Sequence, residues 1–374
     1  MTRQLVIFGA GGDLTSRFLL PALASLQRAR KLPAGFTILG IGRQKLTAAA
    51  FRRHVGARQR LPSSLLRRMH YRAADVRRPS EIVEALRPLR GPVVAYLALP
   101  ADLFVPAVRG IAAAHPPRGS RIVVEKPYGT DLRSTRALNK ILARTFPPNA
   151  VYRMDHFLGK QTVQNILGLR FANRVFEPVW SRRDVQAVDI RWEETLGLEG
   201  RADYYDKAGA LRDLIQNHLL QLLCLVAMEP PAALDARRFR DRKVELLRRV
   251  RRLRPEEVRR LTVRARYSAG KVDGRRVPAY VDEEGVDPAR RTETFAQVVL
   301  FVQNRRWAGV PFTLRTGKAF GRERREIAVA FRDVRAMTFG EEARPRANVL
   351  RFQIDPDRDG PRPQRQRHGG SLQS

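Results

Sequence analysis

The chain has 374 residues, which is enough for two domains, and its 43% hydrophobic content suits a globular protein. It contains one cysteine, which excludes a disulfide framework and a cysteine-based metal site, and we expect no metal. Its formal charge is +34, but the basic residues are spread along the whole chain without an aromatic ladder for stacking bases. We interpret this charge as a compositional bias toward arginine and expect no nucleic-acid partner, although a polyanion-binding protein stays an alternative.

The first segment reads as a buried strand over residues 4–8, a glycine turn over 9–12 and a helix over 14–27. Strand, glycine turn and helix in this order are the context that a dinucleotide-binding fingerprint requires. Glycines let the backbone approach a pyrophosphate, and the helix N-terminus offers free N–H groups and a positive end. The alternative is a glycine turn in some other α/β domain.

A second strand is expected over residues 37–43, and it ends in Arg43. A cofactor with a free ribose 2′-hydroxyl usually meets an acid at this position. A cation suits a 2′-phosphate instead, so the sequence favours NADP over NAD. In so basic a chain, the alternative is that Arg43 belongs to the surface bias.

Further strands alternate with helices through the first 150 residues, which predicts a Rossmann-like, doubly wound parallel sheet. The expected strands cover 71–76, 93–100 and 121–124, and helices cover 101–114 and 132–145. Ligands of such sheets bind at the carboxyl ends of the strands. That rim would hold the glycine turn, Arg43, Pro100 and Lys126.

The second half reads as an α+β domain over residues 151–357 with a large, mainly antiparallel sheet. Helices are expected at 163–176, 208–228 and 237–263, and strands at 185–193, 292–301, 306–314 and 326–331. The last residues, 358–374, are polar, rich in Pro, Gly and Arg, and read as a disordered tail. No apolar run reaches membrane-spanning length and the start lacks a signal peptide, so we expect a cytoplasmic protein with no membrane partner.

Two polar islands mark the second half as the candidate site. The first, Asp155-His156-Phe157-Leu158-Gly159-Lys160, gathers an acid, an imidazole and an ammonium that can hold a phosphate and orient a general base. The second is Gln216-Asn217-His218 on the helix that also carries Asp213. The alternatives are a polar loop that caps a helix and a solvated helix face.

These motifs resemble the glucose-6-phosphate dehydrogenase family from residue 1 to about 357. The matching segments are GAGGDLTSRFLLPAL, EKPYGTDL, YRMDHFLGKQTVQNILGLRFANRVFEPVW, ADYYDKAGALRDLIQNHLLQLLCLVAMEPP and EEGVDPARRTETFAQVVLFVQNRRWAGVPFTLRTGK. The resemblance implies NADP-dependent oxidation of glucose 6-phosphate at C1 to 6-phosphoglucono-1,5-lactone, the first step of the oxidative pentose phosphate pathway. It also implies a homodimer or homotetramer.

The resemblance assigns a role to each candidate residue. His218 would be the general base and Asp155 would orient it. Substrate would be held by Lys126, His156, Lys160, Glu194, Asp213, Lys318 and Gln353. The cofactor would be held by Gly9, Gly12, Asp13, Leu14, Arg43, Pro100 and Lys126.

The chain departs from the family at several places. Phe157 stands where a Tyr is usual, and an arginine expected shortly after Lys318 has Arg324 as its nearest candidate. The match also stops near Asp357, as in a truncated or frame-shifted copy. An inactive relative that keeps only cofactor binding, and a dehydrogenase of the broader sugar-oxidising Rossmann class, therefore stay as alternatives.

Overall fold

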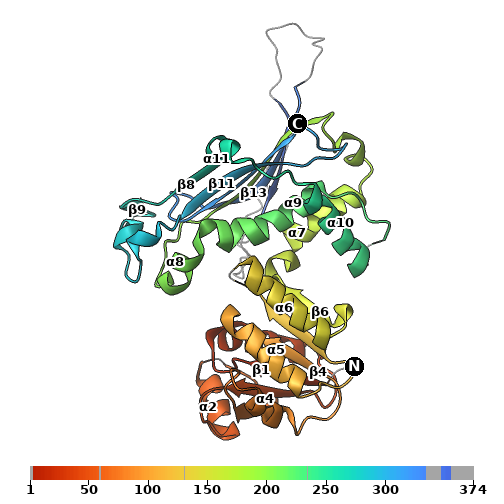
Figure 1. The fold of residues 1–374 in the computed structure, drawn as a ribbon, viewed down its shortest axis with the longest axis vertical. Helices are drawn as coiled ribbons and strands as arrows, with labels where there is room; N and C mark the ends of the chain where they lie inside the picture. The colour runs from red at the N-terminus through yellow and green to blue at the C-terminus, as the bar shows by residue number, and fades with distance from the viewer. Residues whose placement is uncertain (1–2, 59, 130, 234, 334–346, 355–374) are drawn as a thin grey trace, which may run out of the picture. The chain divides into compact units, whose positions relative to one another are not determined.

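A computed structural model describes residues 3–58, 60–129, 131–233, 235–333 and 347–354. The chain divides into two compact units, Met1–Asp155 and His156–Ser374. The expected tail at 358–374 lies outside the described residues. Each unit is built around one six-stranded sheet (Figure 1).

The first unit contains a parallel sheet in the strand order β3-β2-β1-β4-β5-β6. Its strands are β1 (Gln4–Phe8), β2 (Thr37–Gly42), β3 (Met69–Ala73), β4 (Val93–Leu97), β5 (Arg121–Glu125) and β6 (Val151–Met154). This order is that of a Rossmann dinucleotide-binding sheet. The expected doubly wound parallel sheet is therefore confirmed.

Successive strand residues point to opposite faces of the sheet, and apolar residues of β1 point to both. Helices therefore cover both faces. Val6 and Phe8 pack in one cluster with α4 (Pro79–Leu86), α5 (Phe104–Ala113) and α6 (Leu132–Thr145). Ile7 packs in the other cluster, which includes residues of α1 (Leu20–Arg28), α2 (Ala48–Arg58) and α3 (Ser63–Leu66). The helix after the glycine turn starts as a π-helical stretch, η1 (Thr15–Leu19), and continues as α1.

Strand β6 was missed in the sequence because it has no buried run. Only Val151 of its four residues is buried, while Tyr152, Arg153 and Met154 are exposed. It pairs with β5 in parallel, with Val151 opposite Ile122. The strand nevertheless places Asp155 at the carboxyl edge of the first sheet.

The second unit contains a mixed sheet in the order β14-β13-β7-β12-β11-β8. Its strands are β7 (Val185–Glu193), β8 (Thr262–Ala265), β11 (Phe295–Phe301), β12 (Pro311–Gly317), β13 (Arg324–Phe331) and β14 (Val349–Gln353). Only the β7–β12 pair is parallel among these described strands. The expected mainly antiparallel sheet is confirmed, and a small hairpin of β9 (Gly270–Val272) and β10 (Arg275–Val277) lies apart from it.

The strand expected over 306–314 was wrong in its first half. Residues 305–309 form a turn in which Asn304 Oδ1 accepts the N–H of Trp307 at 2.8 Å. Trp307 is fully buried and donates its indole N–H to Ala227 O at 2.7 Å. A buried aromatic residue in a turn imitates a strand pattern, so β12 begins only at Pro311.

Helices α7 (Gln161–Phe171), α8 (Ala202–Ala210) and α9 (Leu220–Ala227) run along one face of this sheet (Figure 1). The single helix expected over 208–228 is interrupted at Gly209, whose φ is 71° and ψ is 167°. After this break the chain forms a π-helix, η6 (Leu211–Leu219), that joins α9. The charged helix expected over 237–263 is likewise two helices, α10 (Ala236–Arg249) and α11 (Pro255–Leu261).

Candidate active site

The glycine turn follows β1 and is fastened to the neighbouring strand ends. The N–H groups of Gly9 and Ala10 both donate to Ile41 O, at 2.9 and 3.0 Å, and Gly12 N–H donates to Gly9 O at 3.0 Å. Gly12 and Asp13 are exposed, and Leu14 immediately precedes the helix. An exposed turn leading into a helix N-terminus suits the pyrophosphate of a dinucleotide.

Gly9 is the position of this turn where a side chain is excluded. Its φ is +85°, and a Cβ there would lie 2.1 Å from Ala98 O at the end of β4. A positive φ alone costs a residue with a Cβ about 1–2 kcal/mol. We therefore expect Gly9→Ala to lower the denaturation midpoint and to weaken dinucleotide binding, measured by urea unfolding and by fluorescence titration with reduced cofactor.

The control for that variant is Gly91→Ala. Gly91 also has a positive φ, +81°, but nothing lies within 4 Å of its Cβ position. It should show the backbone strain without the clash or the loss of cofactor binding. Equal effects of the two substitutions would contradict the inference that Gly9 is needed because β1 approaches the end of β4 too closely for a side chain.

The remaining residues of the expected rim follow the other strands of the first unit. Arg43 is exposed directly after β2, Pro100 and Lys126 come after β4 and β5, and Asp155 comes after β6. Burial first, and then the negative charges of Asp155 and Glu125, raise the pKa of the Tyr128 hydroxyl, which donates to Met154 O at 2.8 Å. The parallel sheet thus gathers the predicted cations and Asp155 at its carboxyl edge.

In the second unit, the first polar island forms a 3-10 turn, η4 (His156–Gly159), followed by α7. Lys160 is the N-cap of α7, and its carbonyl accepts N–H bonds from Val163 and Gln164, both at 3.1 Å. Phe157 is buried and packs against residues of β7 and η6. Its ring centre lies 4.9 Å from the Trp192 ring and 4.9 Å from the His218 ring.

The second polar island lies on η6. His218 is buried, with 4% of its surface exposed, and its ring is stacked on Trp192 with centres 6.4 Å apart. Asp213 is half-buried and accepts from the Tyr204 hydroxyl at 3.3 Å, whereas Gln216 is exposed. The polar residues of this helix are therefore divided between a buried side around His218 and a solvated side.

Lys318 and Glu194 form an ion pair at the ends of two adjacent parallel strands. Lys318 Nζ lies 2.8 Å from Glu194 Oε2, and the Lys318 side chain is only 4% exposed. Glu194 N–H also donates to Gly317 O at 2.9 Å. Burial acts to raise the pKa of Glu194, but the charge and hydrogen bond of Lys318, with help from Trp192 and Arg325, hold it below its ordinary value.

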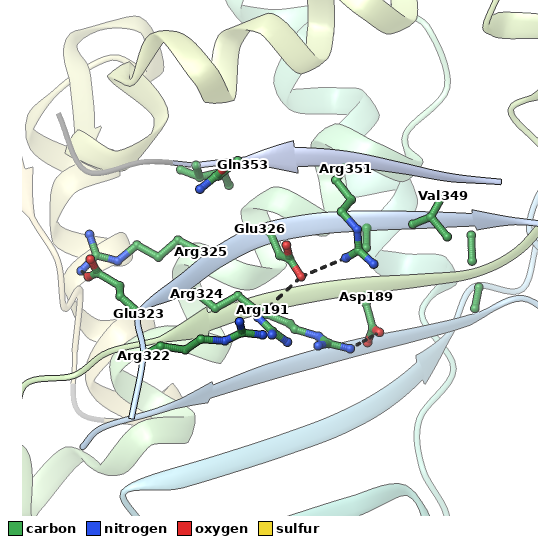
Figure 2. Close-up of a pocket in the computed structure, with 14 residues that line it drawn as sticks. Asp189, Arg191, Arg322, Glu323, Arg324, Arg325, Glu326, Val349, Arg351 and Gln353 are labelled. Carbon is green, nitrogen blue, oxygen red and sulfur yellow. Dashed lines mark hydrogen bonds and ion pairs between the residues drawn. The ribbon is translucent and has the colours of Figure 1, made fainter. Parts of the chain in front are cut away.

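The structure separates Gln353 from this pair. Glu194 and Lys318 continue the series of β7 and β12 residues that face the helices, whereas Gln353 lines a hollow on the other face of the sheet (Figure 2). That hollow measures about 730 Å³. Arg324 lies there too, with Nε 3.9 Å from Glu326 Oε1.

Arg325, not Arg324, is the arginine next to the Glu194–Lys318 ion pair. Its guanidinium carbon lies 4.7 Å above the Trp192 ring, and its Nη2 lies 3.8 Å from Glu194 Oε1. Sequence reasoning named Phe157 only as a departure from the family, and it missed Trp192 and Arg325. The alternation of side chains along β7 and β13 could have indicated Trp192 and Arg325. Each lies two residues from a buried isoleucine, Ile190 or Ile327, and so points to the same face of the sheet.

A Rossmann-type sheet with its glycine turn, followed by a mixed sheet with buried ionisable groups, is typical of a two-domain, dinucleotide-binding oxidoreductase. Two family models match the chain: "Glucose-6-phosphate dehydrogenase, NAD binding domain" over residues 6–165 and "Glucose-6-phosphate dehydrogenase, C-terminal domain" over residues 167–360. The chain belongs to the glucose-6-phosphate dehydrogenase family.

Individual relatives agree with the family models. The chain is 41% identical to the glucose-6-phosphate 1-dehydrogenase of Treponema pallidum over 94% of its own length and 74% of the relative's. It is 39% identical to that of Bacillus subtilis, over 94% and 76%. A solved glucose-6-phosphate dehydrogenase in complex with glucose 6-phosphate superimposes with a TM-score of 0.84 at 32% identity, covering 95% of this chain and 76% of the other. The enzyme from Mycobacterium avium gives 0.83 at 34%, covering 96% and 79%.

Two negative findings apply to the described residues. Among them, we find no group of three or more His, Cys, Asp or Glu side chains placed to hold a metal ion. None of the helices in the described part of the chain combines the length and the apolar character needed to cross a membrane.

Proposed function

We propose that this chain oxidises glucose 6-phosphate at C1 and reduces NADP⁺. The observation that carries the proposal is the contact between the two polar islands in the second unit. Phe157, from the Asp-His-Phe-Leu-Gly-Lys motif, packs against the buried ring of His218. This contact brings together two motifs that lie far apart in the sequence, and it does so at the imidazole of His218.

The chain's residues divide the work between binding and proton transfer. A ring nitrogen of His218 takes the proton of the C1 hydroxyl, and Asp155 orients the ring and stabilises the imidazolium. His156 and Lys160 hold the 6-phosphate. Glu194 and Asp213 accept hydrogen bonds from sugar hydroxyls, while Lys126 and Lys318 donate to the substrate. Gln353 is assigned to the substrate by resemblance alone, and because it lines the hollow on the other face of the sheet its role stays a prediction.

The residues of the first unit fit a dinucleotide. The exposed glycine turn and helix N-terminus, with the backbone of Gly9, Gly12, Asp13 and Leu14, suit the pyrophosphate, and Pro100 and Lys126 lie on the same rim. When bound, the nicotinamide supplies the acceptor for the hydride that leaves C1 as the lactone forms. The choice of NADP over NAD falls to Arg43.

Arg43→Glu is expected to reverse the cofactor preference. A hydrogen bond between a guanidinium and a phosphate contributes about 1.5–3 kcal/mol, so the KM for NADP⁺ should rise about 10–100-fold while that for NAD⁺ stays similar. Initial rates with each cofactor measure this. The matched control is Arg90→Glu, because Arg90 is exposed but precedes β4 at the opposite edge of the sheet. Unchanged preference in Arg43→Glu would assign Arg43 to the general basic surface.

Glucose 6-phosphate deuterated at C1 tests the proposed reaction. The expected result is a reduced cofactor that carries the deuterium, detected by mass spectrometry, together with the lactone or its hydrolysis product. Cofactor reduction without transfer of the label would show that the hydride comes from another carbon.

The resemblance further supports a homodimer or homotetramer in the cytoplasm. Light scattering of the purified chain measures the mass of the assembly, and a monomer at all concentrations would contradict this part of the proposal.

A further inference from the structure

Residues 292–294, Thr-Glu-Thr, form a buried segment directly before β11. Thr292 Oγ1 donates to Asp206 O, in α8, at 2.6 Å. Thr294 O accepts the N–H of Lys318 at 3.0 Å. The segment therefore connects the helix before η6 to the lysine that pairs with Glu194.

Glu293, the middle residue, binds the start of η6 twice. Its carbonyl O accepts the N–H of Ala210 and its Oε1 accepts the N–H of Leu211, both at 3.0 Å. The first N–H groups of a helix have no partner within the helix, and a carboxylate near them also meets the positive end of the helix dipole. Glu293 thus caps η6 from a position 82 residues further along the chain.

The helix break at Gly209 leaves room for the Glu293 carboxylate. A Cβ on Gly209 would lie 2.6 Å from Glu293 Oε1, and the φ of +71° is itself unfavourable for other residues. The other carboxylate oxygen, Oε2, lies 3.0 Å from Arg264 Nη2, but the Arg264 side chain is 61% exposed. An ion pair with so exposed a partner contributes little. The two bonds from Glu293, itself buried, to the start of η6 are the specific feature.

We propose that Glu293 is a positioning residue for Asp213 and His218. Both residues lie on η6, and the cap at Leu211 fixes where this helix starts and how it is turned about its axis. The inference rests on the proposed function, because it assumes that Asp213 and His218 act on the sugar phosphate. It adds a residue that touches neither substrate nor cofactor and acts through a helix.

The test compares three substitutions at one position. Glu293→Ala removes the side-chain cap and should raise the KM for glucose 6-phosphate and lower kcat, each roughly tenfold, since small displacements of reacting groups have large effects on rate. The KM for NADP⁺ should not change. Glu293→Gln keeps an oxygen acceptor for Leu211 and should restore both constants. If Glu293→Ala does not fold, Glu293→Asp, with a carboxylate one methylene shorter, takes its place.

Asp235→Ala is the control for loss of a helix cap as such. Asp235 Oδ1 accepts from the N–H groups of Arg237 and Arg238 at 2.9 Å, on a helix that carries no candidate site residue. This control should lower the melting temperature and leave both KM values unchanged. Kinetic constants of Glu293→Ala equal to wild type, or a Gln variant as impaired as the Ala variant, would overturn the proposal.

Hydrogen exchange of the Leu211 amide provides a readout that needs no activity. It should quicken in Glu293→Ala or Glu293→Asp and stay slow in Glu293→Gln. Unchanged exchange in all variants would refute the cap. A wild-type chain without dehydrogenase activity would instead refute the proposed function, and the exchange result would still decide whether Glu293 holds η6.

Discussion

Replacing His218 by Asn is expected to lower kcat for glucose 6-phosphate oxidation about 10²–10⁴-fold, which is the usual contribution of a general base. Asn keeps a polar side chain but cannot accept the C1 hydroxyl proton and pass it on. The KM for glucose 6-phosphate should change by less than the rate, because binding is assigned mainly to other residues. Initial-rate measurements at saturating cofactor give both constants.

His115→Asn is the matched control for this variant. His115 is exposed in the first unit and has a φ of 48°, a conformation that Asn tolerates. It should leave kcat unchanged. A His218→Asn protein that is folded by thermal melting and keeps more than a tenth of the wild-type kcat would show that another group takes the proton.

Replacing Lys318 by Met is expected to lower the free energy of unfolding by about 2–3 kcal/mol at neutral pH, because it leaves the half-buried carboxylate of Glu194 without its main partner. The same change should raise the KM for glucose 6-phosphate. Urea unfolding and steady-state kinetics measure the two effects. The control is Lys271→Met, since Lys271 is exposed in the small hairpin.

The pH dependence of the Lys318→Met effect has a definite sign. In the wild type the folded-state pKa of Glu194 lies below its ordinary value, so the pair stabilises the protein above that value and this contribution is lost as the pH falls through the folded-state pKa. In the variant, burial acts against fewer opposing groups and should raise that pKa. The stability difference between the two proteins should therefore be largest at neutral pH and shrink in acid.

Adding Glu194→Gln to the Lys318→Met variant should recover part of the lost stability at neutral pH without recovering activity. A stability difference that does not vary with pH, or a double variant no more stable than the single one, would contradict the assigned ion pair.

The first sheet could be predicted from the sequence because its central strands are buried on both sides and read as continuous apolar runs. Strands β1, β2 and β5 match the expected ranges to within one residue, and β4 begins as expected at Val93 but ends at Leu97 instead of 100. Strand β6 escaped because it is short and exposed on most of its length. The break at Gly209 escaped because its cap, Glu293, is supplied by a distant segment, and no local pattern reports such a partner.

The candidate site was predictable only as far as its residues cluster in the sequence or match a family. The two polar islands are local motifs, but the Glu194–Lys318 pair joins residues 124 positions apart. Gln353 was assigned by resemblance alone, and the alternation of β14 places it on the same face as Arg351, where both line the hollow (Figure 2). Phe157, unusual in the motif, proved to be a contact between the islands.

The most direct test of the account is the rate of NADP⁺ reduction by the purified chain in the presence of glucose 6-phosphate, followed by the absorbance of the reduced nicotinamide. The account predicts reduction that requires glucose 6-phosphate, is slower with NAD⁺, and falls about 10²–10⁴-fold in His218→Asn. A soluble, folded chain that binds NADP⁺ yet reduces none of it with glucose 6-phosphate would contradict the account.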